Sequence, residues 1–314
     1  MEATVPDPGV TAADTAGPTG VPVKVGLYLE RIPELSVKDM TWTVVFDVWF
    51  RWSGADLKPA GAMVVMEGSI ESQEKLAKVH EGGEHYERYR VVAKITKVFP
   101  VMRFPLDEHL LTLAVENGEL GRHRMLFVPD TESSSISSRV AVPGYHIAGW
   151  SILEKPHSYK STRGDPRLAA GSKSTRSQLR MGIFLERGNW GLYLKMFQGL
   201  FIAVMIALLA FFIKPTDLDP RFGLGLGALF AAVANSYLVG TFVPDTGELT
   251  MADIANMVGI FTILVTLVES TVSLYLYDHR DEKVLSRRLD QVSLKLILAG
   301  FVLLNVVLAI AAGL

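Results

Sequence analysis

Four long apolar segments in the second half of the chain constrain its fold more than any other feature. They cover residues 193–213, 221–243, 252–277 and 290–314. Each is close to the length of about 20 residues with which a helix crosses a hydrocarbon core about 30 Å thick. Because lipid offers the backbone no hydrogen-bond partners, continuous apolar runs of this length must be helical there. The sequence therefore predicts a transmembrane four-helix domain over residues 190–314.

The part of the chain before these segments, residues 21–189, has the composition of a water-exposed β-domain. Apolar and polar residues alternate in residues 23–32 and 42–52, as they do in strands with one buried face. Further strands are expected at residues 86–98, 110–116, 124–128, 145–153 and 177–186. One short helical turn is expected at residues 73–80. Short strands separated by Gly, Pro, Asp and Ser clusters are typical of sandwiches, so we predict an immunoglobulin-like β-sandwich.

The basic residues between the apolar segments predict how the chain crosses the membrane. Lys214 and Arg221 lie between the first two segments, and residues 244–250, between the second and third, hold no basic residue. The last link holds four, which are Arg280, Lys283, Arg287 and Arg288. Lys and Arg accumulate on the cytoplasmic side of membrane proteins. We therefore expect a multi-pass protein of the inner cell membrane, with the β-domain on the extracellular or periplasmic side.

The bulk composition argues against several classes of function. The net charge of −2 gives no indication of nucleic-acid binding, and without cysteine the chain forms neither disulfides nor thiolate metal sites. No Ser, His and Asp grouping indicates catalysis, so we expect neither an enzyme nor a cofactor. Residues 1–20 are rich in Pro, Gly, Ala and Thr and lack the basic start and apolar core of a signal peptide. We expect a flexible arm there, with export directed by the apolar segments or by a signal outside this sequence.

The second apolar segment differs from the other three in the residues that share one helical face. Steps of four and three residues place six positions on one stripe, which are Gly223, Gly227, Phe230, Ala234, Tyr237 and Thr241. Because the stripe mixes very small residues, aromatic rings and a hydroxyl, we predict that it lines a pore. One helix cannot enclose a pore, so a channel requires a ring of subunits. Gly223 and Gly227 have two open interpretations, close helix contact or a wide inner pore lined by backbone.

Four further motifs carry a family resemblance. Phe-Pro-Leu-Asp occupies residues 104–107, Trp52 ends the second predicted strand, and Arg187 precedes the first span. Arg221 opens the second span and Pro244 follows it. Together with four spans and a short cytoplasmic loop, these features resemble the cysteine-free prokaryotic pentameric ligand-gated ion channels of the Cys-loop receptor superfamily. The likeness extends to the C-terminus, with two departures. The first span has no internal proline, and Ser-Gly-Ala-Asp follows Trp52 in place of the usual Trp-x-Asp.

The resemblance implies a homopentamer in membrane lipid that conducts monovalent cations when a small-molecule agonist binds. Asp219 would form a ring of carboxylates at the cytoplasmic mouth and raise the local cation concentration. The alternative is that Asp219 and Pro220 only start the helix. Anion-selective relatives tend to carry Pro-Ala before the arginine, whereas this chain has Asp-Pro, so we expect cation selectivity. Rings of Phe230 or Tyr237 would form an apolar constriction, unless these side chains pack against neighbouring helices.

The resemblance also implies a junction at which outer loops meet the spans. Phe104, Pro105 and Asp107 belong to one such loop, and Pro244 fixes the direction in which the chain leaves the second span. Asp107 and Arg187 are candidates for an ion pair, the alternative being that both are solvated. Removing one partner of a buried pair leaves a costly charge, which suits a switch.

The implied agonist site lies between subunits in the β-domain. Asp47, Trp49 and Arg51 occupy the face of the second strand opposite the predicted core set, which is Phe46, Val48, Phe50 and Trp52. Arg163 and Arg167 lie in the loop expected to cover the site, where they suit an anionic ligand or are merely solvated. That loop has no aromatic residue, so no cage for a quaternary amine is apparent.

Two acidic features lie outside the stripe and the junction, and two other hypotheses for the whole chain stay open. Residues 80–85, His-Glu-Gly-Gly-Glu-His, indicate a turn that matches no zinc motif and suits at most weak modulation by a divalent cation. Glu269 inside the third span should face the bundle or water. A membrane-anchored sensor without conduction is the second hypothesis for the whole chain, and a membrane enzyme is the third. The stripe on the second span, with its acidic entry, favours the channel.

Overall fold

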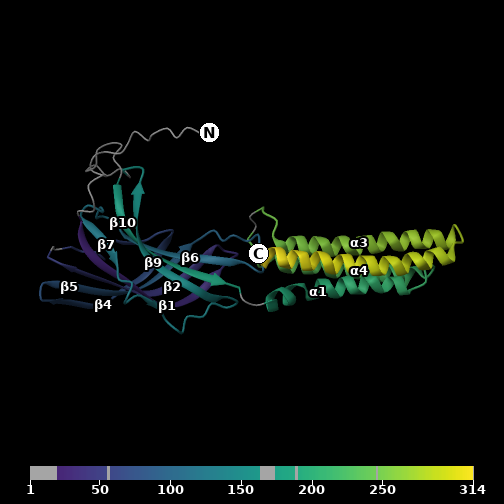
Figure 1. Ribbon diagram of the computed structural model, residues 1–314, viewed down its shortest axis with the longest axis horizontal. Helices are drawn as coiled ribbons and strands as arrows, with labels where there is room; N and C mark the ends of the chain where they lie inside the picture. Colours follow the sequence, from purple (N-terminus) through teal and green to yellow (C-terminus); the bar gives the residue numbers. More distant parts are fainter. Residues whose placement is uncertain (1–19, 55–56, 163–173, 188–189, 245–246, 314) are drawn as a thin grey trace.

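The chain forms two parts that lie end to end. The computed structural model describes residues 20–54, 57–162, 174–187, 190–244 and 247–313. A domain rich in β-structure occupies one end of the molecule, and four helices run side by side away from it (Figure 1). The last helix runs back toward the β-domain, so the C-terminus lies near the middle of the long axis (Figure 1).

Ten strands in two sheets build the β-domain within the described residues. The bounds are β1 (Val21–Ser36), β2 (Thr41–Ser53), β3 (Met63–Val65), β4 (Gly68–Glu81), β5 (Glu84–Thr96), β6 (Glu108–Asn117), β7 (Met125–Pro129), β8 (Ser135–Ile136), β9 (His146–Tyr159) and β10 (Ser174–Glu186). One sheet has the order β4-β5-β2-β1-β7, with β8 also on β1, and the other has the order β3-β6-β10-β9. All pairings are antiparallel except those of β1 with β7 and β8.

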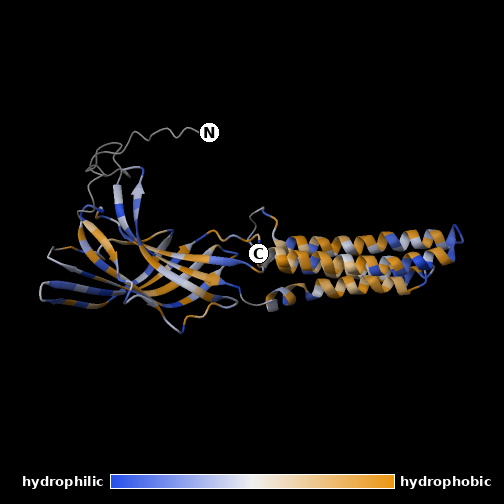
Figure 2. Ribbon diagram, in the orientation of Figure 1, coloured by the Kyte–Doolittle hydropathy of each residue, from blue (hydrophilic) through white to orange (hydrophobic). Residues whose placement is uncertain are grey.

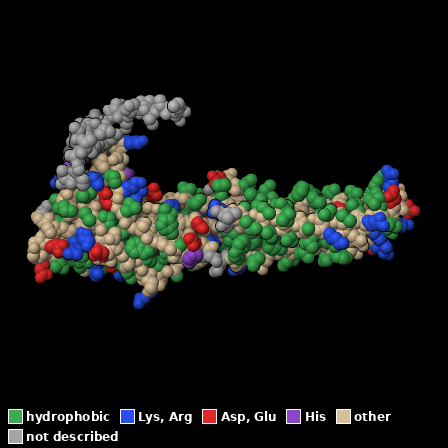
Figure 3. Space-filling model, in the orientation of Figure 1, with side chains coloured by type: hydrophobic (Ala, Val, Ile, Leu, Met, Phe, Trp, Pro, Cys, Tyr) green, Lys and Arg blue, Asp and Glu red, His purple; other side chains and the backbone are tan. Residues whose placement is uncertain are grey.

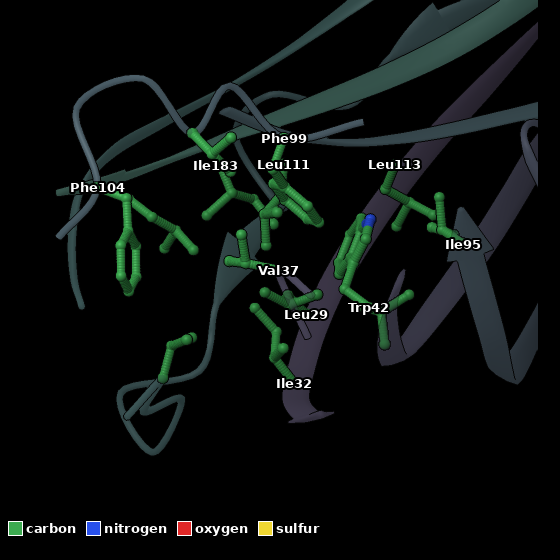
Figure 4. Close-up of a cluster of buried hydrophobic side chains, with 14 of the residues drawn as sticks. Leu29, Ile32, Val37, Trp42, Ile95, Phe99, Phe104, Leu111, Leu113 and Ile183 are labelled. Atoms are coloured by element: carbon green, nitrogen blue, oxygen red, sulfur yellow. The ribbon is translucent and has the colours of Figure 1, made fainter. Parts of the chain in front are cut away.

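The two sheets bury one hydrophobic core between them. The predicted core face of β2 is confirmed, because Phe46, Val48 and Phe50 are fully buried. Figure 4 shows how the sheets meet, with Trp42 of β2 beside Leu113 of β6. Burial of such side chains, at about 25 cal/mol per Å² of apolar surface, is the main stabilisation of the domain.

The short helical turn expected at residues 73–80 is wrong, because these residues belong to β4. This strand lies at the edge of its sheet and pairs only with β5, so most of its side chains face water and the apolar alternation is missing. The predicted turn at residues 80–85 is confirmed. Gly82 and Gly83 have φ of 59° and 82°, which glycine adopts at little cost.

The second part holds four helices that are long and apolar enough to cross a membrane. They are α1 (Trp190–Leu208), continued by the 3-10 helix η1 (Leu209–Phe212), α2 (Leu218–Gly240), α3 (Met251–Asp278) and α4 (Lys283–Gly313). Apolar residues cover most of their length, and hydrophilic residues gather at the end away from the β-domain (Figure 2). Thr250 and Asp253 form a capping box that fixes the start of α3.

Tight packing holds α2 against its neighbours α1 and α3. Gly225 faces Leu267 of α3 so closely that a Cβ atom would overlap the leucine side chain. On the same face Asn235 donates a hydrogen bond of 3.0 Å to Asn256 of α3. A buried amide in an apolar bundle is costly unless it is paired, so this bond fixes the rotation of α2 about its axis.

Candidate functional site

The predicted stripe on α2 points away from the helices of its own chain. All six positions are exposed, and Phe230 and Tyr237 expose 75% and 80% of their surface. The opposite face is buried and consists of Arg221, Gly225, Ala228, Ala232, Asn235 and Val239. Among the described residues, Phe230 and Tyr237 therefore do not pack against helices of their own chain.

The two glycines of the stripe are not the ones that pack against a neighbouring helix. A Cβ atom at Gly223 or Gly227 would meet nothing within 4 Å, whereas Gly225 lies against α3. Within one chain, close helix contact at Gly223 and Gly227 is therefore excluded. Their backbone is bare on the exposed face of α2.

The two charged residues at the start of α2 point in different directions. Asp219 is exposed in the first turn and does not cap the helix, because Asp217 precedes that turn. Arg221 is fully buried, and its Nη2 lies 2.7 Å from Asp290 Oδ1 of α4 and 3.6 Å from Glu269 Oε2 of α3. The exposed stripe therefore carries the acid without the arginine. Glu269 faces the bundle, as expected, and is 8% exposed.

A buried cluster joins the β-domain to the start of the helices, and it contains the predicted ion pair. Arg187 Nε donates to Asp107 Oδ1 at 2.8 Å, and Tyr145 donates its hydroxyl to Asp107 Oδ2 at 2.9 Å. The guanidinium of Arg187 also bonds to the Tyr145 hydroxyl and stacks 4.1 Å from the centre of its ring. Asp107 is 1% exposed, so the alternative of two solvated charges is wrong.

The electrostatics of this cluster keep its groups in defined protonation states. Burial would raise the pKa of Asp107, but the adjacent His109 and Arg187 outweigh it and hold that pKa below its ordinary value. Burial raises the pKa of Tyr145, so its hydroxyl stays protonated and donates. An ionised carboxylate thus holds two donors that come from other segments of the chain.

The remaining predicted junction residues are all buried. Phe104 and Pro105 are covered, and the ring of Phe104 lies 5.5 Å from the Arg187 guanidinium. Pro244 is also buried, just after the C-terminal end of α2. In the same region Met251 donates its backbone N–H to Met102 at 2.8 Å, which ties the start of α3 to the loop before Phe104.

The predicted ligand residues of β2 line a pocket of about 460 Å³ on the outer face of the larger sheet. Its walls include Tyr28, Asp47, Trp49, Arg51, Tyr86 and Arg88. The acids are already bound within the chain, because Asp47 accepts from Arg90 at 2.9 Å and Asp130 accepts from Trp49 at 3.1 Å. Gly26 leaves the room in which the indole of Trp49 lies.

The charge of this pocket follows from these bonds. Burial would raise the pKa of Asp130, but Trp49 and Lys24 outweigh it and keep the pKa low. Lys24 lies 3.1 Å from Asp130, so that acid is neutralised. Arg88 has no ion-pair partner among the described residues. The pocket therefore offers aromatic surface with one uncompensated cation.

A polar cluster that the sequence did not reveal lies on the smaller sheet, on the face opposite the core. Glu116 of β6 is buried and accepts hydrogen bonds from Gln178 of β10 at 3.0 Å and from the hydroxyl of Tyr159 of β9. His157 Nδ1 lies 2.8 Å from the same carboxylate. Alternation places Glu116 and Gln178 opposite the core residues, but only the strand register shows that they are neighbours. Arg163 and Arg167, predicted for the adjoining loop, lie outside the described residues.

No model of a known protein family matches the chain, and no curated protein matches it either. The family resemblance therefore rests on the motifs of this chain. Among the described residues, no group of three or more His, Asp and Glu side chains is arranged to hold a metal ion.

Proposed function

We propose that the chain is the subunit of a homopentameric, cation-selective ligand-gated ion channel of the inner cell membrane, with an immunoglobulin-like extracellular domain. The observation that carries this proposal is the outward face of α2. That helix is the least apolar of the four, with a mean hydropathy of 1.6 against 2.0 to 2.5 for the others. Its exposed stripe carries small, aromatic and hydroxyl side chains where a helix facing lipid would carry aliphatic ones.

In a ring of subunits, this stripe would line the central pore. Symmetric rings form when each subunit repeats the same contact with the next, and they place one helix from every subunit around the axis. Asp219 would then form an acidic ring at the cytoplasmic mouth, which attracts cations and repels anions. Phe230 and Tyr237 would form apolar constrictions that close the pore by excluding water. Gly223 and Gly227 would widen the pore between the acid ring and these constrictions.

The buried cluster of Asp107, Tyr145 and Arg187, which we call the junction cluster, supports coupling between the β-domain and the pore. Asp107 and Arg187 join the loop after β5 to the segment that enters α1, while Met102 contacts the start of α3. The chain between Pro244 and Met251 connects that contact to the outer end of α2. Ligand binding would favour one arrangement of these contacts and so shift the population from closed to open channels.

The pocket beside Trp49 is the proposed agonist site. Tyr28 and Tyr86 offer apolar surface, and Arg88 offers a charge to an anionic group. The pocket lies on the outer face of the larger sheet, which a neighbouring subunit would cover. A small anionic molecule with an apolar part fits these walls best.

Electrical recording from purified protein in planar bilayers tests the proposal. We expect currents that appear with a ligand or a change in pH and that reverse near the cation equilibrium potential. Native mass spectrometry should give a pentamer. Ligand binding to a monomer or dimer without current under any condition would instead favour the membrane-anchored sensor.

A further inference from the structure

Two histidines face each other at the tip of the hairpin that joins β4 to β5. The turn consists of Gly82 and Gly83, and the strand register pairs His80 directly with His85. Both turn residues have positive φ, as in the type I′ turns that close two-residue hairpins. In such a hairpin the second pair from the turn is not hydrogen-bonded, so its side chains lie close together. The ring centres of His80 and His85 are accordingly 4.2 Å apart.

The packing of Trp52 holds one of the two imidazole rings in place. The rings of Trp52 and His85 are stacked, with centres 5.0 Å apart and an angle of 10° between their planes. Trp52 is 5% exposed and belongs to the core between the sheets. His80 is exposed on the edge strand, so its ring can turn toward that of His85. One ligand is thus positioned in advance, and only the other has to be ordered when an ion binds.

The acids at the tip of the hairpin do not share the face of the two histidines. Alternation along a strand places Glu81 and Glu84 on the other side of the sheet. Glu84 is also engaged, because Arg51 Nη2 donates to both of its carboxylate oxygens at 3.1 Å. Glu87, which is on the histidine face, already accepts from the hydroxyl of Tyr89 at 2.6 Å. The sequence indicated at most weak modulation by a divalent cation at this turn, whereas the geometry offers two ring nitrogens on one face.

The two ring nitrogens determine which ion suits the site. Imidazole is a ligand of copper, nickel and zinc, whereas calcium and magnesium prefer oxygen ligands. Metal–nitrogen bonds of about 2.0 Å place two neighbouring ligand nitrogens roughly 3 Å apart. Rings whose centres are 4.2 Å apart can therefore reach one ion without movement of either strand. Among the divalent ions of the first transition row, affinity is highest for Cu²⁺.

The hairpin lies where dissolved ions can reach it. β5 runs from the hairpin to Thr96, and the chain beyond it contacts the start of α3 through Met102. The hairpin is therefore at the opposite end of the strand from the helices. Charged side chains are spread over the β-domain, whereas hydrophobic side chains cover most of the helices (Figure 3). An ion can thus enter from water without any opening of the domain.

We propose that His80 and His85 bind one Cu²⁺ ion per chain, with water in the remaining coordination positions. Two protein nitrogens in neighbouring positions suit the tetragonal geometry of Cu²⁺. The ion joins β4 to β5 at their tip and so stabilises β4, which lies at the edge of its sheet. The site requires neither a ring of subunits nor conduction by the helices.

Electron paramagnetic resonance of the full-length protein in detergent, titrated with CuCl₂, tests the site. Wild type should give one tetragonal Cu²⁺ signal per chain, with superhyperfine splitting from two nitrogens. His85→Phe keeps a ring against Trp52 but removes one ligand, and His80→Asn removes the other. Each should lower the affinity on the order of a hundredfold, because the second imidazole binds at a high effective concentration once the first has bound. Calcium at millimolar concentration should not displace the ion.

Two matched controls separate the histidine pair from other groups of the chain. His123→Asn/His279→Asn removes two exposed histidines elsewhere and should leave the affinity within about twofold of wild type, as is usual for surface substitutions. Glu81→Gln/Glu84→Gln should leave it equally unchanged. An equal loss in the first control, a loss confined to the acid variant, or a wild-type spectrum with a single nitrogen overturns the proposal.

Discussion

Helices α2 and α4 both have a face that no other part of the chain covers, yet the two faces differ in chemistry. The exposed face of α4 is aliphatic and includes Val302, Leu303, Val306, Val307 and Ile310. The exposed residues of α2 include the stripe of Gly223, Gly227, Phe230, Ala234, Tyr237 and Thr241, with Asp219 at its start, beside the aliphatic Leu226, Val233 and Leu238. Lipid hydrocarbon would suit the first face, because these side chains of α4 are themselves hydrocarbon. Under the proposed function the second face meets water or another subunit, so the kind of exposed residue separates the two helices, whereas exposure alone does not.

The largest loss of stability is expected at the Arg221–Asp290 ion pair, which joins α2 to α4. Arg221→Gln removes the cation that α2 places beside Asp290 and Glu269, and breaking a buried ion pair costs about 3–5 kcal/mol. Thermal unfolding in detergent should show the loss. Arg288→Gln, an exposed arginine of α4, should change stability by no more than about 0.5 kcal/mol. The double variant Arg221→Leu/Asp290→Leu should recover much of the stability, and failure to do so would argue against the pair as the cause.

A loss of stability of similar size is expected at the junction between the β-domain and the helices, near the C-terminal end of α2 and the start of α3. Asp107→Asn leaves Arg187 buried without its carboxylate, at a cost of about 3–5 kcal/mol. Because the pKa of Asp107 is lowered on folding, its stabilising effect is present above the ordinary aspartate pKa of about 4 and disappears as pH falls further. The difference in melting temperature between wild type and variant should therefore shrink below about pH 4. A constant difference down to pH 2 would contradict this explanation.

A smaller change in stability should distinguish the exposed face of α2 from that of α4. An amide placed in hydrocarbon without a partner costs roughly 2 kcal/mol or more, whereas one that faces water costs little. Leu303→Gln on α4 should therefore destabilise the protein, and Phe230→Gln on α2 should not. Thermal unfolding of both variants in nanodiscs measures the contrast. Equal destabilisation would mean that α2 also faces lipid.

The smallest effect is expected at the mouth of the proposed pore. A charge interaction across about 4 Å of water is worth about 1 kcal/mol, so Asp219→Asn should lower the ratio of cation to anion permeability roughly fivefold. Reversal potentials under a salt gradient measure this ratio. Asp281→Asn removes an exposed acid from the α3–α4 loop and should leave the ratio unchanged. If the two variants behave alike, Asp219 does not control selectivity.

The features that the sequence predicted well depend on periodicity and hydrophobicity. Alternation in β2 identified its core face because Phe46, Val48 and Phe50 pack in the core between the sheets, and the apolar runs identified four helices. The same reasoning failed for β4, whose exposed edge position removes the alternation. It also missed that α4 begins at Lys283, seven residues before its apolar run, since Lys283, Arg287 and Arg288 interrupt the apolar residues there.

Contacts between distant segments were much harder to predict. The Asp107–Arg187 pair was anticipated only through the family resemblance, and neither the burial of Arg221 nor its partner Asp290 follows from any local pattern. The Glu116 cluster likewise depends on the register of three strands. Such contacts are set by the packing of whole elements, which one sequence does not encode as a local pattern.

The central claim is that the α2 stripe borders water, and cysteine accessibility tests it most directly. Because the chain contains no cysteine, single substitutions introduce the only thiol. In liposomes, Tyr237→Cys should react rapidly with a membrane-impermeant, positively charged thiol reagent and thereby block the current, while Leu303→Cys should remain unreacted. Equal protection of both thiols in open-channel conditions would contradict the account.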